Sequence, residues 1–352
     1  MPLRLHPFPH LLHPPSGRAY NRLPVTRDGV RRVPAGELVR SDRPAFGELR
    51  ITTLADSRPS RGICGLLPAA AFLDGSVRPH EQTLLSRLQR QEEVVMADEG
   101  GMGKPVLITV PSLAEFWETL ARERAAGSPL VTFNGRNNDY ELRLLRPSDG
   151  SPQPLSLADF GPVCIADGHH RAETHARLAA RGYGQCARVP VCLIGADELT
   201  IGVFTREIVP RFAVGELPER LAPYFEPTEI TLPLAPAHPG EWLLARAGKY
   251  YALRRRDSGP DNDATWLNAT VLPRVFGITD TRADERISFN PVATTPGEPV
   301  DYAFPPDRTV LIGFPLPPAV FFREVAAGKL LPPKSTRFEP RVPSGLVVWP
   351  GC

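Results

Sequence analysis

Short runs of apolar residues, separated by clusters of proline, glycine and charged residues, recur along most of the chain. Runs of about four to eight apolar or β-branched residues predict strands, and apolar residues that recur every three or four positions predict helices. The strand-like segments are 49–54, 63–72, 131–135, 140–145, 163–166, 189–195, 199–209 and 250–256. The helix-like segments are 82–95, 113–126, 169–179 and 268–276. This mixture predicts an α+β fold with a mixed central sheet.

Changes in composition divide the chain into three parts. Residues 1–45 are rich in proline, arginine and histidine and show little periodicity, which predicts an irregular N-terminal arm. Residues 46–212 hold most of the predicted strands and form the expected core. A proline-containing link leads into residues 213–352, a C-terminal subdomain that we expect to contribute to the same cleft as the core.

The segment Pro162–Leu178, PVCIADGHHRAETHARL, concentrates polar side chains at the junction of a predicted strand and a predicted helix. The first N–H groups of a helix have no partner within the helix, and their partial positive charge favours an anion. Carboxylate, imidazole and guanidinium groups are used to hold phosphates and metal–phosphate pairs. The segment therefore predicts a phosphate site, hereafter the box, formed by Asp167, Gly168, His169, His170 and Arg171. Asp167 is also a candidate Mg²⁺ ligand and catalytic residue.

Two other interpretations of the box stay open. A pair of histidines in the first turn of a helix can be a solvated cap. A zinc site is less favoured, because the spacing is not H-E-x-x-H, the nearest third imidazole, His175, lies on another helical face, and no cysteine pair is close. The preceding apolar strand favours a functional site, since ligands in α/β architectures bind beyond the carboxyl ends of strands.

Three further segments carry candidate site residues. The helix predicted over 82–95 places His80 and Glu81 at its start, where a glutamate either complements the helix dipole or serves as a base. Arg206 interrupts an apolar strand, and it is either exposed at a sheet edge or holds a second phosphate. A loop near the C-terminus has prolines on both sides, and because proline restricts the backbone, this loop would hold polar groups rigidly around phosphates. This loop contains Lys334, Ser335, Thr336 and Arg337.

Two other polar segments are not assigned to a site. Residues 100–110, GGMGKPVLITV, look like a phosphate loop but lack G-x-x-x-x-G-K-[ST] and lead into a strand instead of a helix. Residues 280–286, DTRADER, alternate in charge, so mutual salt bridges are favoured over a catalytic role.

The composition narrows the class of protein. A hydrophobic content of 42% with 23% charged residues is ordinary for a globular protein, while 41 prolines indicate many extended loops. The formal net charge of +2 gives no global field that would attract nucleic acid or an anionic membrane. The N-terminus has no long apolar run, so we predict neither a signal peptide nor a membrane span. Five cysteines without a C-x-x-C pair indicate reduced thiols and a cytoplasmic location.

Five segments, in order along the chain, resemble one protein family. IADGHHRAETHARL resembles the signature of the bacterial and archaeal family called domain of unknown function 1015 (DUF1015), and it looks like the phosphate-binding box of the ParB/sulfiredoxin superfamily. The other similar segments are VRPHEQTL (77–84), DELTIGVFTREIV (197–209), GITDTRADERISF (277–289) and AAGKLLPPKSTRFEPRVPSGLVV (326–348). The resemblance implies a ParB/sulfiredoxin-like core with a C-terminal α/β subdomain packed against it. His169 stands where sulfiredoxin has its reactive cysteine, which argues against sulfiredoxin chemistry.

The same resemblance implies nucleotide chemistry, because the best-understood relatives are free-serine kinases, ParB proteins bind CTP and sulfiredoxin uses ATP. Two functions stay open. One is a nucleotide-dependent phosphotransferase acting on a small hydroxyl metabolite, with Glu81 as general base assisted by His80 and Asp167. The alternative is a nucleotide-binding regulatory module without catalysis, in the ParB manner. The expected ligands are ATP, ADP or CTP with Mg²⁺ and a small-molecule substrate, without nucleic acid or membrane, and the sequence leaves open whether the chain forms a homo-oligomer.

Overall fold

The computed structural model describes residues 2–15, 38–81, 83, 85–97, 100–123, 128–135, 137–145, 152–259 and 262–351. The chain forms two compact units. Unit 1 comprises Met1–Thr200 and Pro340–Cys352, and unit 2 comprises Ile201–Glu339. The chain therefore leaves unit 1, builds unit 2 and returns to complete unit 1 with its last residues.

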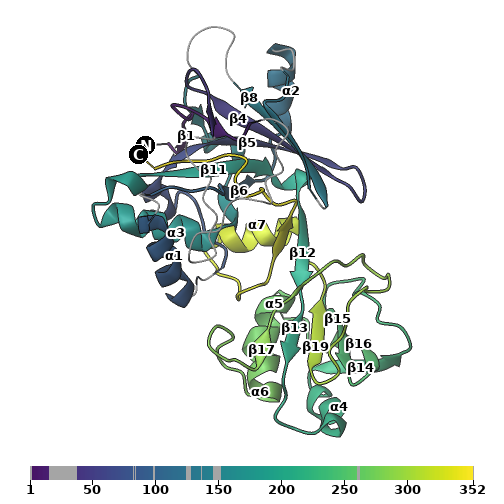
Figure 1. Ribbon diagram of the computed structural model, residues 1–352. Coiled ribbons are helices and arrows are strands. Elements are labelled where there is room, and N and C mark those ends of the chain that lie inside the picture. Colours follow the sequence, from purple (N-terminus) through teal and green to yellow (C-terminus); the bar gives the residue numbers. More distant parts are fainter. Residues whose placement is uncertain are drawn as a thin grey trace. The chain divides into compact units, whose positions relative to one another are not determined.

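The main sheet of unit 1 has seven strands in the order β10-β6-β11-β5-β4-β8-β7 (Figure 1). β11 runs parallel to β6, and the other neighbouring pairs are antiparallel, so the predicted α+β class with a mixed sheet is confirmed. In chain order the strands are β4 (Phe46–Thr53), β5 (Pro59–Pro68), β6 (Val106–Val110), β7 (Val131–Asn134), β8 (Asn138–Leu145), β10 (Cys164–Asp167) and β11 (Arg188–Gly195). The predicted hairpin is present as β7 and β8.

Apolar sequence explains where the interior of this sheet lies. The strands β6, VLITV, and β11, VPVCLIG, are almost continuous apolar runs, and nearly every residue in them is buried. The α-helices in the described part of unit 1 are α1 (Leu85–Ala97), α2 (Ala114–Glu123) and α3 (His169–Ala180). Ala172 and Ala176 of α3 pack into the main core, while Leu178 contacts Val95 of α1. The small alanine side chains let α3 lie close to the sheet.

Short elements complete unit 1. Two pairs of strands, β1 with β9 and β2 with β3, lie outside the main sheet. They are β1 (Arg4–Leu5), β2 (Leu12–His13), β3 (Val39–Arg40) and β9 (Leu155–Ser156). The 3₁₀ turns are η3 (Ala69–Phe72), η4 (Ala158–Phe160), η5 (Gly184–Cys186) and η6 (Ala196–Glu198). Part of the predicted N-terminal arm, residues 16–37, lies outside the described residues.

Unit 2 is built on an antiparallel sheet of six strands in the order β14-β16-β15-β19-β13-β17. They are β13 (Arg206–Ile208), β14 (Phe225–Ile230), β15 (Glu241–Arg246), β16 (Lys249–Arg255), β17 (Ile287–Ser288) and β19 (Thr309–Gly313). A smaller sheet has the order β18-β12-β20, with β12 (Thr200–Phe204), β18 (Pro291–Val292) and β20 (Arg337–Glu339). The remaining helices are η7 (Val214–Glu216), α4 (Leu217–Leu221) and α7 (Pro318–Ala326).

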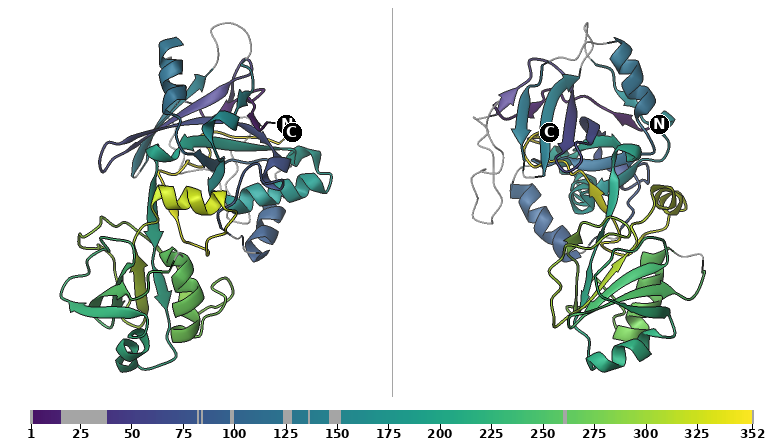
Figure 2. Two further views of the ribbon diagram at one scale, coloured as in Figure 1. Left: turned by 180° about the vertical axis from the view of Figure 1, so that it is seen from behind. Right: turned by 90° about the vertical axis from the view of Figure 1, so that its right-hand side faces the viewer.

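A continuous helical segment covers one face of the six-stranded sheet, as Figure 2 shows from two sides. It consists of α5 (Asp263–Trp266), the π-helix η8 (Leu267–Val271) and α6 (Leu272–Phe276), so the helix predicted over 268–276 begins five residues earlier. Asn262 starts it by accepting a hydrogen bond from the Thr265 N–H. Pro273 has no N–H to donate to the preceding turn, and the π turn before it accommodates that missing bond.

Several smaller expectations also have an outcome. The DTRADER charges pair as expected, Asp280 with Arg282 at 2.9 Å and Asp284 with Arg286 at 2.5 Å, although the segment is folded into turns and is not extended. The described cysteines, residues 64, 164, 186 and 192, are free thiols, and Cys352 lies outside the described residues. Among the helices that the structure describes, none is both long enough and apolar enough to cross a membrane.

Candidate functional site

The predicted box follows β10, the edge strand of the unit 1 sheet. A second segment of the chain lies along this edge, because Arg78 pairs with Cys164 in a parallel bridge. The Arg78 N–H donates to the Val163 carbonyl, and the Ile165 N–H donates to the Arg78 carbonyl, both at 2.9 Å. This pairing brings His80 and Glu81 beside the box. The expectation that they begin a helix is wrong, since they belong to an extended segment and α1 begins only at Leu85.

The turn between β10 and α3 depends on Gly168. Its φ of 103° lies in the left-handed region that side chains with a Cβ rarely adopt. A Cβ placed on it would come within 2.5 Å of an Arg171 guanidinium nitrogen. The pairing of β10 with β6 also shifts between Ile165 and Asp167, which leaves Ala166 as an extra residue. The bulge and the glycine together turn the chain sharply from strand into helix at Asp167.

The carboxylate of Asp167 lies among three cationic side chains. The Lys104 Nζ lies 3.3 Å from Oδ2, an Arg171 guanidinium nitrogen lies 3.2 Å from the same oxygen, and an Arg341 nitrogen lies 3.8 Å from Oδ1. Arg171 also donates to the Pro105 carbonyl at 3.4 Å. Three cations and one carboxylate give this cluster, hereafter the cationic cluster, a local charge of +2.

The electrostatics of the cationic cluster follow from burial and from charge. Burial opposes ionisation of Asp167, but the attraction of Lys104, Arg171 and Arg341 outweighs it, so the pKa of this carboxyl is well below its usual value. Burial also lowers the pKa of Lys104, and the two arginines lower it further, while Asp167 opposes the change. The Nε of Arg171 is buried and has no hydrogen-bond partner among the described residues. Such a cluster favours an anion of charge about −2, such as a phosphate group.

His80 lies behind the box and is fully buried. Its Nδ1 is 2.6 Å from the Ile165 carbonyl oxygen, and because a carbonyl only accepts hydrogen bonds, Nδ1 carries the proton. Burial lowers the pKa of His80 to about 4, against the opposing effects of the Ile165 carbonyl and Asp167. At pH 7 the imidazole is therefore neutral, and Nε2 holds a lone pair.

Glu81 and His169 share the space around His80. The Glu81 Oε1 lies 4.0 Å from His80 Nε2, and the His80 N–H donates a long hydrogen bond of 3.4 Å to His169 Nε2. The two rings meet edge to face, with their centroids 4.4 Å apart. One ligand atom from each of the three residues lies within 4.8 Å of the others. This group, hereafter the His-Glu-His cluster, is where the described residues could hold a metal ion, and Glu81 is also placed to act as a base.

Nearby contacts fix the segment that carries Glu81. The Thr83 hydroxyl donates to the Glu173 carboxylate on α3 at 2.6 Å. His170, the second histidine of the box, is half-buried in the same first turn as His169. Burial raises the pKa of the Cys164 thiol to about 12, so this cysteine stays protonated and is a poor nucleophile.

Sequence reasoning missed two residues of the cationic cluster. Lys104 belongs to the glycine-rich segment in which no Walker site was predicted, and it reaches Asp167 because β6 pairs with β10. Arg341 follows the predicted C-terminal loop by four residues and lies in the segment that returns to unit 1. The sequence did offer one signal for Lys104, because it is a basic residue just before the strand to which the segment GGMGKPVLITV leads.

The remaining predicted residues lie in unit 2. Arg206 is buried on β13 between β19 and β17, so the alternative of an exposed edge is wrong. It donates to the Phe204 carbonyl at 3.0 Å and lies over the Trp242 ring. In the C-terminal loop, Lys334 has a left-handed φ of 61°. Its Nζ is 5.2 Å from the centre of the Phe204 ring.

The other residues of that loop are held by short-range contacts. The Ser335 hydroxyl donates to the Pro332 carbonyl at 2.7 Å, and Thr336 is buried. Arg337, at the start of β20, donates to Glu339 at 2.8 Å. The prediction that the loop binds phosphate, and that it does so together with the box, stays a prediction.

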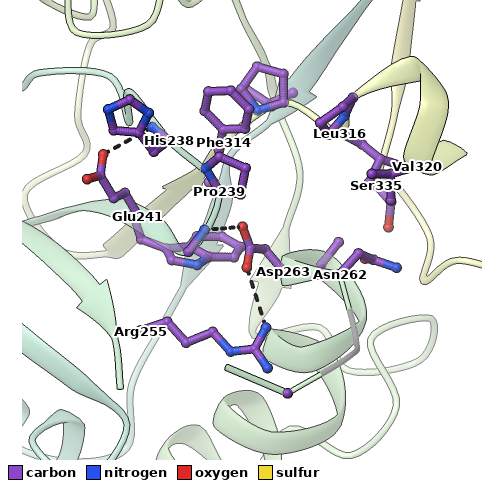
Figure 3. Close-up of a pocket in the computed structure, with 18 of the residues that line it drawn as sticks. His238, Pro239, Glu241, Arg255, Asn262, Asp263, Phe314, Leu316, Val320 and Ser335 are labelled. Atoms are coloured by element: carbon purple, nitrogen blue, oxygen red, sulfur yellow. Dashed lines mark hydrogen bonds and ion pairs between the residues drawn. The ribbon is translucent and has the colours of Figure 1, made fainter. Parts of the chain in front are cut away.

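Unit 2 contains a cavity of about 570 Å³, and both Arg206 and Ser335 line it. Figure 3 shows Arg255 and Asp263 facing each other across a 3.6 Å ion pair in the wall of this cavity. Asp263 also accepts a hydrogen bond from the Gly240 N–H at 2.7 Å. The cavity is lined by four arginines and three carboxylates, so its formal charge is smaller than that of the cationic cluster.

Comparison with known proteins gives one family and several distant structures. The model of a family described as protein of unknown function (DUF1015) matches residues 20–278. No curated protein matches the chain. Similar solved structures include SbnI with C-terminal truncation from Staphylococcus aureus (TM-score 0.46, 18% identity, covering 81% of this chain and 86% of that chain). A second is a free serine kinase in complex with AMP, with a TM-score of 0.41 and 16% identity, covering 81% of this chain and 90% of that chain. A third is a conserved hypothetical protein from Pyrococcus furiosus, with a TM-score of 0.40 and 16% identity, covering 82% of this chain and 95% of that chain. These TM-scores all lie below 0.5.

Proposed function

The chain belongs to the DUF1015 family of proteins of unknown function, and from that premise we propose that it is a nucleotide-dependent phosphotransferase acting on a small hydroxyl metabolite. The observation that carries this proposal is the local charge of +2 around Asp167 at the start of α3. Cations and helix N–H groups aimed at one point stabilise the charge of phosphoryl oxygens. A structural ion pair needs only one cation for one carboxylate, so the two additional cations support an anionic ligand.

Each residue of the box receives a role under this proposal. Gly168 lets the backbone approach a phosphate, and His169, His170 and Arg171 donate hydrogen bonds to its oxygens. Lys104 and Arg341 add positive charge that would attract the same phosphate. Asp167 orients these cations. Phosphoryl transfer has a loose transition state, in which positioning and charge stabilisation supply most of the catalysis.

Glu81 is the proposed general base. Its carboxylate is mostly buried, with 16% of the side chain exposed, and it lies beside the first turn of α3. His80 next to it is neutral at pH 7, so its imidazole does not hold the carboxylate by charge. Glu81 would accept the proton of the substrate hydroxyl as the oxygen attacks phosphorus.

Mg²⁺ bound with the nucleotide would neutralise phosphate charge and hold the phosphates in line. The assignment of Asp167 as a Mg²⁺ ligand stays a prediction, and we place no step of the reaction on it. Both oxygens of this carboxylate already face cationic groups. Arg206 and the loop residues Lys334 to Arg337 likewise stay predicted phosphate ligands. Loss of nucleotide affinity in Arg206→Leu or Lys334→Ala would support them.

Two measurements test the proposed function. Calorimetric titration with ATP, ADP and CTP in the presence of Mg²⁺ identifies the nucleotide, and incubation with free serine and other hydroxyl metabolites identifies the acceptor. We expect Glu81→Gln to lower turnover by about 10²- to 10⁴-fold with little change in nucleotide affinity, because Gln keeps the shape but accepts no proton.

A matched control is Glu92→Gln, which alters a half-buried glutamate paired with Arg181 on the same unit and should leave turnover unchanged. Undiminished turnover in Glu81→Gln excludes this residue as the base. Nucleotide binding without turnover on any acceptor favours the regulatory module instead. Absence of nucleotide binding contradicts both functions.

A further inference from the structure

The His-Glu-His cluster has a feature that the general-base role of Glu81 does not explain. The His80 Nδ1–H donates a hydrogen bond to the Ile165 carbonyl, so Nε2 is the unprotonated ring nitrogen and holds a lone pair. This Nε2 lies 4.0 Å from a Glu81 oxygen. His169 Nε2 accepts the His80 N–H at 3.4 Å, so it too is unprotonated. One ligand atom from each of the two imidazoles and the carboxylate thus lies within 4.8 Å of the others, and a bound metal would replace the long His80 N–H contact as the partner of His169. An arrangement of this kind is stabilised by a cation.

We propose that His80, Glu81 and His169 bind a divalent transition-metal ion of the zinc type. Two imidazoles and one carboxylate are a common ligand set for zinc and for other first-row ions. Ligand atoms of tetrahedral zinc lie about 3.4 Å apart, given bond lengths of about 2.1 Å. The atoms of this cluster lie within 4.8 Å of one another, so a small movement of the Glu81 side chain completes the set.

The surroundings of His80 support this assignment. A histidine that binds a metal usually donates its other ring nitrogen to a carbonyl or carboxylate, which fixes the ring and its tautomer. His80 does so through its 2.6 Å contact with Ile165, and its ring is fully buried. The ligand nitrogen is therefore oriented before a metal arrives.

The chemistry of the ligands excludes the alkaline-earth ions from this site. Mg²⁺ and Ca²⁺ prefer oxygen ligands, and this cluster offers a single carboxylate. Zinc was disfavoured from sequence because the spacing is not H-E-x-x-H, the nearest third imidazole, His175, lies on another helical face, and no cysteine pair is close. The pairing of Arg78 with Cys164 supplies His80 and Glu81 from a segment about 90 residues away.

Metal binding would regulate the reaction, a part of the inference that rests on the proposed function. A Glu81 carboxylate bound to Zn²⁺ is a weaker base, and it is held away from the position from which it would accept the proton of a substrate hydroxyl. The metal-bound protein would hold nucleotide in the cationic cluster but transfer phosphate slowly. The site would therefore act as an inhibitory switch that responds to zinc and not to magnesium.

The first test measures metal binding alone and needs no nucleotide. Purified full-length protein, freed of metal, is titrated with Zn²⁺ by calorimetry and with Co²⁺ by visible absorption, in excess Mg²⁺. We expect one equivalent to bind, with a Co²⁺ spectrum typical of four- or five-coordination. Glu81→Gln and His169→Gln should each weaken binding by about 10-fold or more, whereas His170→Gln, an imidazole outside the cluster, should change it less than about 2-fold.

Circular dichroism of each variant establishes that it is folded before titration. Equal affinity in all variants, or no stoichiometric binding by the wild type, overturns the metal site whatever the reaction proves to be. The second test adds Zn²⁺ to the active protein. Turnover should fall as the site fills and return when a chelator is added, and turnover unchanged at saturating Zn²⁺ overturns the inhibitory role while leaving the binding result intact.

Discussion

Two carboxylates, a half-buried one in unit 1 and a buried one in unit 2, have opposite kinds of partner. Asp167 in unit 1 follows an edge strand and faces Lys104, Arg171 and Arg341 at 3.2 to 3.8 Å. Its cluster carries a net charge of +2. Glu207 in unit 2 is buried in the middle of β13, with strands paired on both sides.

Glu207 is held mainly by neutral donors. It accepts from the Tyr302 hydroxyl, and burial together with this contact raises the pKa of Tyr302, which keeps the phenol protonated as a donor. It has one cationic neighbour, an Arg308 nitrogen at 3.8 Å. The other donors are Asn290 at 2.8 Å, Thr205 at 3.4 Å and Ser288 at 3.5 Å. One glutamate and one arginine leave this cluster neutral.

The difference shows how charge balance distinguishes a candidate binding site from a structural one. Around Glu207, Oε1 accepts from Tyr302, Asn290 and Thr205, and Oε2 accepts from Ser288 and pairs with Arg308. The positive charge of Arg308 matches the negative charge of Glu207, so the cluster fixes the 288–308 segment to β13. Around Asp167 the cations outnumber the anion by two. An excess of positive charge in a partly buried site raises the free energy of the folded protein unless an anion binds there.

The largest predicted effect concerns the neutral cluster. Glu207→Ala would leave Tyr302, Asn290 and Arg308 without their acceptor, and we expect a loss on the order of 3 kcal/mol in the free energy of unfolding. Urea denaturation measures this loss. Nucleotide affinity should not change. The matched control, Glu226→Ala, removes an exposed partner of Arg256 in the same unit and should cost less than about 1 kcal/mol.

The second prediction concerns the cationic cluster. Arg171→Lys keeps the charge but removes the planar fork that contacts both Asp167 and the Pro105 carbonyl. We expect nucleotide affinity to fall about 10-fold, which is about 1.4 kcal/mol, while the urea midpoint moves little. His169→Ala and His170→Ala should also weaken binding. Unchanged calorimetric affinity in all three variants would remove the phosphate site from the box.

The comparison also shows which parts of the molecule the sequence could predict. The strand–glycine–helix turn that carries the box was predictable because its signals are local, namely an apolar strand, a glycine that permits the left-handed turn, and polar residues at the next helix start. The β7–β8 hairpin and the charge pairs of residues 280–286 were predictable for the same reason. Each depends on residues only a few positions apart.

The parts that could not be predicted depend on strand order. Lys104 reaches Asp167 because Leu107 of β6 pairs with Asp167 itself, across 60 residues of chain. Arg341 does so because the chain returns to unit 1 after building unit 2. His80 was assigned to a helix, since the pattern of 82–95 says nothing of the bridge between Arg78 and Cys164. Hydrophobic periodicity sets the type of an element but not its neighbour in a sheet.

The third prediction separates an anion site from a cation site at Asp167. Asp167→Asn removes the one negative charge that competes with a phosphate group for Lys104, Arg171 and Arg341. If the cluster binds phosphate directly, nucleotide affinity should rise by about 2- to 5-fold, as expected for a partly screened charge. If Asp167 holds Mg²⁺, affinity should fall instead and lose its dependence on Mg²⁺. Titration with and without Mg²⁺ distinguishes the two.

The smallest predicted effect concerns acid stability, and it also differs between the units. Unit 1 buries His175 beneath the box, where its ring contacts the Arg171 carbonyl at 3.0 Å and the Gly100 carbonyl at 3.2 Å. Burial lowers the pKa of His175, and Arg171 adds to this, against the opposing effect of the two carbonyls. The histidine of unit 2, His238, is exposed. Unit 1 should therefore be the more sensitive of the two to mild acid.

The sign of this effect follows from proton binding. In the unfolded chain His175 takes up a proton as the pH falls through about 6.5, whereas in the folded chain it does so only at lower pH. Between these two values the unfolded state binds more protons, so stability decreases as the pH falls. His175→Gln removes the titrating group, and its urea midpoint should depend less on pH between about 7 and 5 than that of the wild type. His238→Gln is the matched control, and it should keep the full pH dependence of the wild type. An equal loss of pH dependence in both variants would show that burial beneath the box is not its cause.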